Sequence, residues 1–317
     1  MRTPSSRPTV SPILILSFGL LAVSTASILI RFAQQDVPSL VIAAYRMALA
    51  TIVLAPIAIT RHRTELRRLT RKDLILACTS GLFLALHFAT WITSLEYTTI
   101  ASSVIFVTTT PLWVALFSPL FLKEPLPRLA LVGMGIALVG SVIVGLSDSC
   151  RLSAAGLACP SLADFLQGKT FLGNFLALVG AWTAAGYLMI GRRLRAKMSL
   201  VGYIFFVYGI AACILVGIML AAGQKPIGYP PQAYLLMLLL ALVPQLLGHT
   251  SYNWALRYLS AAYVAVVTLG EPVGAIILAY FLLQELPPAL KIFGAILTLV
   301  GIYVVSKLTL ATRSEKP

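Results

Sequence analysis

The sequence predicts an all-α integral membrane protein with ten transmembrane helices, arranged as two inverted sets of five. Three observations predict this fold. Hydrophobic residues make up 59% of the 317 residues and charged residues only 11%, whereas a soluble domain carries roughly 25% charge. Ten apolar stretches can each cross a hydrocarbon core of about 30 Å, which takes about 20 helical residues. Finally, the chain repeats itself at a constant spacing, so that Tyr97 is matched by Tyr258.

The repeat is clearest in the later part of each half, where residues recur without a gap: Tyr97, Pro111, Glu124, Gly133 and Gly140 return as Tyr258, Pro272, Glu285, Gly294 and Gly301. We call this spacing, which is the difference between the residue numbers of Tyr258 and Tyr97, the repeat offset. It is far longer than the period of solenoid repeats, so two duplicated halves are the better interpretation. Each half contains an odd number of spans, and the second half must therefore be inverted relative to the first. Many secondary transporters share this arrangement and bind their substrate between the repeats.

The predicted spans are continuous apolar runs without the alternation of barrel strands. In order they are residues 12–33, 38–60, 73–96, 99–122, 128–147, 170–190, 201–222, 232–256, 261–283 and 289–308. This pattern divides the chain into an N-terminal tail (1–11), a first half (12–147), a loop (148–169), a second half (170–308) and a C-terminal tail (309–317). A signal peptide cleaved within residues 22–27 is the alternative for the first span, but the apolar run continues to Ile30.

The net charge of +14 follows membrane topology rather than a nucleic-acid site. If the N-terminus is cytoplasmic, 18 of the 24 basic residues fall on the cytoplasmic side, five fall outside, and Arg46 lies within a span. The positive-inside rule then places both termini in the cytoplasm of a multi-pass cell-membrane protein. The expected partners are the lipid bilayer and a small-molecule substrate, with no nucleic acid, and the chain is compatible with a monomer or a homodimer.

Two of the four cysteines lie in the longest loop, which this topology places outside the cell. Cys150 and Cys159 are separated by eight residues, and an oxidising compartment would permit a disulfide between them. Two unrelated thiols are the alternative interpretation.

Two formally charged residues lie within the predicted spans, Arg46 in the second and Glu271 in the ninth. Charged side chains are costly in lipid and usually face the protein interior. Counting about 1.5 Å per residue from the ends of their helices places both near the midplane. They are interpreted either as a structural ion pair or as residues of the substrate path, and the two roles are compatible.

Neutral polar residues also gather on single helical faces. In the third span the face contains His87, Thr90, Trp91 and Ser94; in the eighth it contains Gln245, His249, Tyr252 and Asn253. Because lipid-facing stripes are uniformly apolar, these faces are predicted to look inward onto a polar cavity. Ordinary hydrogen bonds between helices are the alternative for any single residue. The predicted substrate-binding residues are Arg46, His87, Trp91, Gln245, His249, Asn253 and Glu271; no catalytic residue, metal site or cofactor is predicted.

Prolines interrupt two equivalent spans, at Pro111 and Pro272, and in a membrane such breaks are tolerated beside a cavity. Glu124 and Glu285 follow at the next turn, where a carboxylate can stabilise the N-terminus of the following helix. The fifth and tenth spans instead contain small residues that predict close-packed faces: Gly133, Ala137, Ser141, Gly294 and Thr298.

The inverted five-plus-five repeat, with a proline in the fourth and ninth spans and a glutamate closing each, resembles the EamA-type carriers of the drug/metabolite transporter superfamily. The resemblance is carried by Pro111-Leu112 through Leu122-Lys123-Glu124 and by Leu269-Gly270-Glu271-Pro272-Val273 through Leu283-Gln284-Glu285. It implies export or exchange of small metabolites, often amino acids or aromatic compounds, through a central cavity. It also implies that spans five and ten lie at the periphery.

The leading hypothesis is therefore a secondary transporter of a small metabolite, amino acid-like or an aromatic or organic anion, working by alternating access around a midplane cavity. Proton-coupled antiport through Glu271 and passive facilitated transport are both compatible with the sequence. The chain lacks a Walker-type Gly-Lys-Ser/Thr sequence, which argues against direct use of ATP. A membrane enzyme acting on lipid is the other class considered, but the HExxH and GxSxG motifs are absent.

Overall fold

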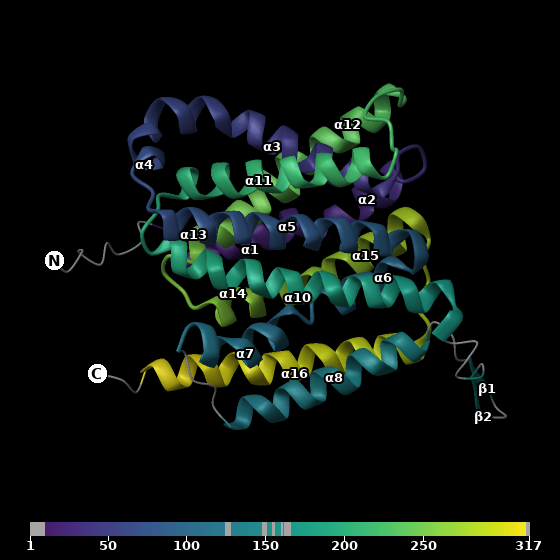
Figure 1. Ribbon diagram of the computed structural model, residues 1–317. Coiled ribbons are helices and arrows are strands. Elements are labelled where there is room, and N and C mark those ends of the chain that lie inside the picture. Colours follow the sequence, from purple (N-terminus) through teal and green to yellow (C-terminus); the bar gives the residue numbers. More distant parts are fainter. Residues whose placement is uncertain are drawn as a thin grey trace.

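The computed structural model describes residues 10–123, 128–147, 151–153, 156–159, 161 and 166–314. Within these residues the protein is a bundle of long helices, with one short β-hairpin at one end (Figure 1). Eight helical segments of the described chain are long and apolar enough to cross a membrane. Two further apolar helices occupy the positions of the predicted fifth and tenth spans.

The first half follows the predicted spans closely. Its helices are α1 (Pro12–Ser24), α2 (Ala26–Ala33), α3 (Ser39–Arg61), α4 (Arg63–Arg67), α5 (Arg71–Tyr97), α6 (Ile100–Val107), α7 (Thr110–Phe121) and α8 (Arg128–Ser147). The predicted first span is thus a pair, α1 and α2, and the predicted fourth span is the pair α6 and α7. The hairpin follows, with β1 (Arg151–Ser153) paired antiparallel to β2 (Gly156–Ala158).

The second half has the same order of helices. It comprises α10 (Lys169–Arg195), α11 (Leu200–Ala221), α12 (Pro231–Leu240), η1 (Ala241–His249), α13 (Thr250–Ala255), α14 (Ala261–Val267), η2 (Thr268–Gly270), α15 (Glu271–Leu283) and α16 (Ala289–Ser314). The predicted eighth span is α12, η1 and α13 in sequence, and η1 is a π-helix. The predicted ninth span is α14, η2 and α15, where η2 is a 3₁₀ turn.

The breaks in the fourth and ninth spans are equivalent and are built by equivalent residues. Each span begins with a hydroxyl N-cap: Thr99 accepts from the Ser102 amide at 3.3 Å, and Ser260 accepts from the Tyr263 amide at 3.2 Å. A cap of this kind satisfies an amide that the first turn leaves unpaired. The helix after each break starts with a proline at one of its first two positions, where the missing amide costs nothing. The predicted proline interruptions are confirmed.

The principal contacts in the bundle join one half to the other (Figure 1). Helix α5 lies along α10, α3 along α11, α1 along η1, and α8 along α16. Helices α8 and α16 form a pair at the side of the bundle, where they also contact α6 and α14. The implied peripheral position of the fifth and tenth spans therefore agrees with the structure.

Glycines let α8 and α16 approach closely, and the contacts are reciprocal. A Cβ atom added to Gly140 would lie 2.5 Å from the Thr298 amide nitrogen and 2.6 Å from the Gly294 carbonyl oxygen. A Cβ added to Gly301 would lie 2.5 Å from the Gly133 carbonyl oxygen. Thr298 also donates to the Ala137 carbonyl at 3.4 Å, and these two residues are counterparts in the repeat. The predicted close-packed faces are confirmed for these residues, while the Ser141 side chain lies outside the described part of the chain.

We expect Gly140→Leu to destabilise the protein strongly, because its side chain would meet the backbone of α16, which cannot move aside without separating the two helices. Overpacking of this kind costs about 1–3 kcal/mol or more. Gly135→Leu on the same helix is the matched control, because nothing lies within 4 Å of its added Cβ. The measurement is the apparent Tm in detergent by size-exclusion after heating. Equal Tm values for the two variants would contradict this packing.

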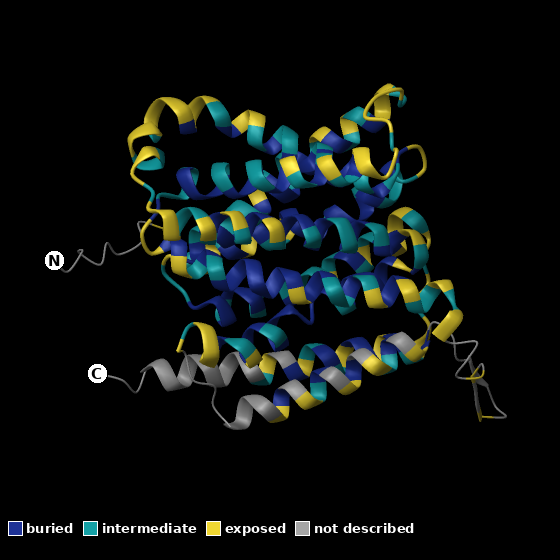
Figure 2. Ribbon diagram, in the orientation of Figure 1, coloured by how far each residue is buried: buried dark blue, intermediate teal, exposed yellow. Residues whose placement is uncertain are grey.

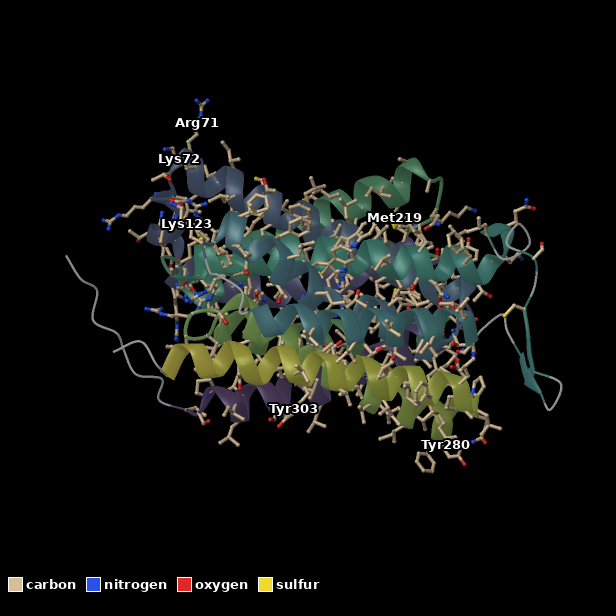
Figure 3. All side chains as sticks on the ribbon, turned by 90° about the horizontal axis from the view of Figure 1, so that it is seen from below. Arg71, Lys72, Lys123, Met219, Tyr280 and Tyr303 are labelled. Atoms are coloured by element: carbon tan, nitrogen blue, oxygen red, sulfur yellow. The ribbon has the colours of Figure 1, made fainter. Side chains whose placement is uncertain are left out.

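The outer surface of the bundle is strongly apolar, as expected for contact with lipid. Leu21, Leu120 and Phe281 are 71%, 74% and 68% exposed, while buried residues concentrate between the helices (Figure 2). Arg71, Lys72 and Lys123 all lie at one end of the bundle, and the Tyr303 side chain projects from α16 nearer its middle (Figure 3). The start of α1 and the end of α16 lie at this same end, opposite the hairpin (Figure 1).

The hairpin occupies the loop for which a disulfide is predicted. Cys150 lies outside the described residues, so the bridge to Cys159 stays a prediction. In the hairpin, Arg151 pairs with Ala158 and Leu152 with Leu157. The two cysteines immediately flank the Arg151–Ala158 pair in the sequence, which is a sequence spacing compatible with a bridge across the hairpin.

Candidate functional site

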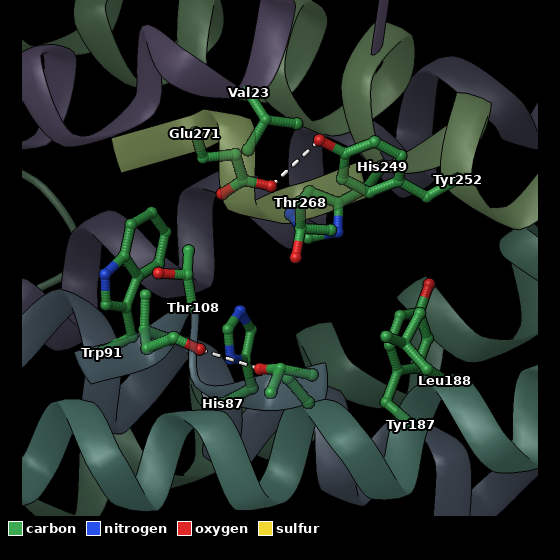
Figure 4. Close-up of a pocket in the computed structure, with 13 residues that line it drawn as sticks. Val23, His87, Trp91, Thr108, Tyr187, Leu188, His249, Tyr252, Thr268 and Glu271 are labelled. Atoms are coloured by element: carbon green, nitrogen blue, oxygen red, sulfur yellow. Dashed lines mark hydrogen bonds between the residues drawn. The ribbon is translucent and has the colours of Figure 1, made fainter. Parts of the chain in front are cut away.

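A cavity of about 50 Å³ lies in the middle of the bundle, between the two halves (Figure 4). Side chains of α1, α5, α6, α7 and α10 line it together with η1, α13, η2 and α15. Its lining residues are Val23, His87, Trp91, Val107, Thr108, Thr110, Ala184, Tyr187, Leu188, His249, Tyr252, Thr268 and Glu271. A cavity therefore lies between the two halves, and its mostly apolar wall carries the polar groups of His87, His249, Tyr252 and Glu271.

Both broken spans meet at this cavity. Thr108 and Thr110 come from the break between α6 and α7, and Thr268 and Glu271 come from η2 and the first residue of α15. Thr110 and Glu271 are related by the repeat offset, so equivalent positions of the two halves carry a hydroxyl and a carboxylate. Irregular backbone at membrane depth is tolerated where it lines a cavity, and the partial positive charge of a helix N-terminus favours polar ligands there.

Four aromatic side chains at the cavity form pairs related by the repeat. Phe88 and Trp91 of α5 correspond to His249 and Tyr252 at the repeat offset. The Phe88 and His249 rings meet edge to face with centroids 5.4 Å apart. His249 contacts Tyr252 at 5.9 Å, and His87 stacks on Trp91 at 5.8 Å. Such arrangements are the preferred packing of aromatic rings.

Hydrogen bonds orient three of the lining side chains. His87 Nδ1 lies 2.9 Å from the Gly180 carbonyl oxygen. A carbonyl only accepts, so Nδ1 carries the proton and, in the neutral ring, Nε2 is the free acceptor. The Tyr252 hydroxyl donates to Glu271 Oε1 at 2.9 Å (Figure 4), and this bond fixes the carboxylate at the cavity wall.

Arg46 lies behind the cavity wall and does not line it. The side chain is fully buried, and its Nε donates to Gln245 Oε1 at 2.9 Å. The guanidinium carbon lies 4.2 Å from the centre of the Phe88 ring and 6.0 Å from that of Trp91, a cation–π geometry. Arg46 and Gln245 thus lie behind the lining residues, and their predicted role in substrate binding stays a prediction.

The predicted ion pair of Arg46 with Glu271 is also not formed. Among the described residues no nitrogen of Arg46 lies within 4.0 Å of a carboxylate oxygen. The two residues are nevertheless close enough to interact electrostatically. Their charges are thus coupled across the site without direct contact.

Asn253 holds other residues rather than lining the cavity. Its Oδ1 accepts from the Tyr187 hydroxyl at 2.8 Å, and its Nδ2 donates to the His249 carbonyl at 2.9 Å. Of the seven predicted binding residues, the structure places His87, Trp91, His249 and Glu271 on the wall and Arg46, Gln245 and Asn253 behind it. Sequence reasoning did not include Phe88 and Tyr187. The aromatic match of Phe88 with His249 across the repeat could have identified the first.

Comparison with known proteins agrees with the two-half architecture. The EamA-like transporter family matches this chain twice, over residues 10–146 and 171–307. An uncharacterized transporter of Archaeoglobus fulgidus is 24% identical over 212 residues, covering 67% of this chain and 68% of that protein. The uncharacterized transporter YdfC of Bacillus subtilis is 21% identical over 263 residues, covering 82% and 79%.

A solved crystal structure has the same fold, with a TM-score of 0.67 at 19% identity over 96% of this chain and 99% of that chain. The duplicated family match spans most of the sequence and coincides with the two halves that enclose the cavity. The chain therefore belongs to the EamA-like transporter family and is a multi-pass membrane transporter.

Proposed function

We propose that this protein is a secondary transporter that moves a small metabolite, amino acid-like or an aromatic or organic anion, through the central cavity by alternating access. The observation that carries the proposal is the cavity itself, because it lies between the halves, is lined by both broken spans and carries polar side chains on a mostly apolar wall. At about 50 Å³ the cavity is narrow, whereas ligand sites have volumes of about 300–1,000 Å³. It must widen to admit a metabolite, as alternating access requires.

We further propose ten spans in an inverted five-plus-five repeat. Reciprocal contacts support this arrangement, since Gly140 meets Thr298 and Gly294 while Gly301 meets Ala137 and Gly133. At the repeat offset Gly301 is the counterpart of Gly140, and the partners Thr298 and Gly294 are the counterparts of Ala137 and Gly133. A two-fold axis in the membrane plane produces such exchanged contacts.

A second pair of counterparts makes similar bonds, each within its own half. Arg31 and Arg192 are related by the repeat offset. They donate to the Thr98 and Leu256 carbonyls respectively, each at 2.8 Å. Counterpart arginines thus bind backbone carbonyls in corresponding regions of the two halves, although Thr98 and Leu256 are not themselves counterparts, and this supports the duplication.

Both termini are proposed to be cytoplasmic in the cell membrane. The location of Arg71, Lys72 and Lys123 at the end where α1 begins and α16 ends supports this orientation (Figure 3). The hairpin end would then face outward. There, a second cavity of about 540 Å³ is bounded by residues that include Arg31, Glu96, Thr98 and Glu285.

At this outer end an ion pair joins the two halves. Arg31 Nη2 lies 3.9 Å from Glu285 Oε1, and Glu285 Oε2 accepts from the Ile100 amide at 3.2 Å. Glu285 thus accepts from the first amide of α6 in the other half. The sequence had predicted a role at the N-terminus of the helix that follows Glu285, and that role stays a prediction. Glu124, the counterpart of Glu285, lies outside the described residues. Opening of the outer side would separate Arg31 from Glu285, so they act as a latch in the proposed cycle.

We expect the Arg31→Gln variant to populate the conformation that is open to the outer side more than the parent protein does. A partly exposed pair contributes about 0.2–1 kcal/mol, which corresponds to a change in population of up to about fivefold. The readout is labelling of Ala184→Cys in the cavity by an impermeant maleimide, in a background where all four native cysteines are replaced by alanine. Lys225→Gln, an exposed position, is the control. Unchanged labelling in Arg31→Gln would show that the Arg31–Glu285 pair does not act as a latch.

The proposed function is tested in proteoliposomes. Candidate amino acids and aromatic or organic acids are first screened by thermal shift, and hits are then assayed for uptake with and without a pH gradient. Saturable uptake supports a carrier. Accumulation against a concentration gradient that requires the pH gradient indicates a proton-coupled antiporter, and equilibration alone indicates a facilitator. Failure of every stabilising compound to enter the vesicles would contradict the proposal.

A further inference from the structure

Arg46 carries a positive charge that no direct contact balances. Only its Nε has a hydrogen-bond partner, while Nη1 and Nη2 are buried without one among the described residues. Burying an ionised group without a paired charge is strongly unfavourable. Glu271 does not supply that pair directly, because among the described residues no Arg46 nitrogen lies within 4.0 Å of a carboxylate oxygen. The stacking of the guanidinium on Phe88 offsets part of this cost, but leaves both terminal nitrogens unbonded.

Two further buried donors beside Arg46 are also unpaired. The side-chain amide nitrogen of Gln245 and the indole nitrogen of Trp91 have no hydrogen-bond partner among the described residues. Gln245 is fixed against Arg46 through its oxygen, so its NH₂ group belongs to the same cluster. The Tyr208 hydroxyl interacts weakly with the Gln245 side chain and with the Arg46 charge, without the geometry of a hydrogen bond to either. Trp91 in turn forms part of the cavity wall and so connects the cluster to the cavity.

These unpaired groups are all donors, so they select a ligand group that only accepts. A carboxylate accepts through two oxygens and matches the fork of a guanidinium with two parallel bonds. An amide or an alcohol would bring its own hydrogens toward these donors. The adjoining Phe88, Trp91 and His249 rings are tilted against one another and offer aromatic faces and edges to whatever the carboxylate is attached to.

We propose that Arg46, Gln245 and Trp91 form a carboxylate-binding subsite at the back of the central cavity, with the aromatic rings contacting the rest of the ligand. The inference rests on the proposed function only in assigning this carboxylate to the transported molecule. Binding itself can be measured without transport.

The test uses the full chain in detergent and compares benzoate with benzamide at constant ionic strength, with sodium chloride as the balancing salt. Benzoate should raise the Tm saturably, and benzamide should not. Gln245→Glu is the decisive variant, because it preserves size and the acceptor for Arg46 Nε while placing a carboxylate beside the guanidinium. It should fold normally and bind benzoate about tenfold more weakly or not at all, since it removes one donor and repels the ligand's charge.

Trp91→Phe should keep an aromatic ring and weaken benzoate binding several-fold through loss of one donor. The matched controls are Gln167→Glu, at an exposed site just before α10, and Trp254→Phe on α13, which does not line the cavity. Both should bind benzoate as the parent protein does.

Equal stabilisation by benzamide, or undiminished benzoate affinity in Gln245→Glu, would overturn the subsite. Benzoate binding that persists while no carboxylate is transported would refute the proposed transport and leave the subsite standing. If benzoate does not bind, while an uncharged compound is transported equally well by the parent protein and by Gln245→Glu, the subsite is refuted and the proposed transport stands.

Discussion

Replacing Arg46 by lysine is expected to slow transport of an anionic substrate by about ten- to a hundredfold while the protein still folds. Lysine keeps the charge but has no planar fork, so it cannot make two parallel bonds to a carboxylate. It also removes the Nε donor and leaves Gln245 Oε1 unpaired. Loss of one or two charge-assisted bonds at about 1.5–3 kcal/mol gives this range.

The measurement is the initial rate of uptake into proteoliposomes for the compound that stabilises the parent protein most. Arg257→Lys is the matched control, because it makes the same change at an exposed position and should transport normally. Monodisperse elution of both variants excludes a folding defect. Transport by Arg46→Lys at the parental rate would show that Arg46 is structural.

Glu271→Gln is expected to abolish accumulation driven by a pH gradient and to leave folding intact. Glutamine keeps a carbonyl oxygen where Glu271 Oε1 accepts from Tyr252, so this bond survives. The variant lacks the group that could take up a proton at the cavity wall. One coupled proton supplies about 1.4 kcal/mol per pH unit, which is a tenfold concentration ratio, and this ratio should fall to one.

The groups that face Glu271 define the controls for this result. They are Tyr252, which is bonded to it, Arg46, which acts through its charge, and the cavity histidines His87 and His249. Glu96→Gln removes an exposed carboxylate at the outer cavity and should leave coupling unchanged. If Glu271→Gln still accumulates substrate, coupling passes through a histidine. A parent protein that only equilibrates substrate would identify a facilitator.

The sequence alone predicted the spans and their duplication, because both depend on local properties. Apolar length decides which segments can cross a membrane, and a repeat is visible without knowledge of contacts. The breaks in the fourth and ninth spans were equally local, since Pro111 and Pro272 constrain the backbone wherever their helices pack. The membrane location of Arg46 and Glu271 followed from the same spans.

Only the tertiary structure decided how each helix is rotated against its neighbours, and with it which polar residues face the cavity. Helical spacing groups Gln245 with His249 and Asn253, yet the π-helix η1 spans Gln245 and His249, and Gln245 points to Arg46 while His249 lines the cavity. Lipid is as apolar as the core, so hydrophobicity does not set this rotation. Close contacts at small residues set the rotation instead, such as that of Gly19 against Gly248 between α1 and η1. These contacts bring together Arg46 and Gln245, which lie far apart in the sequence.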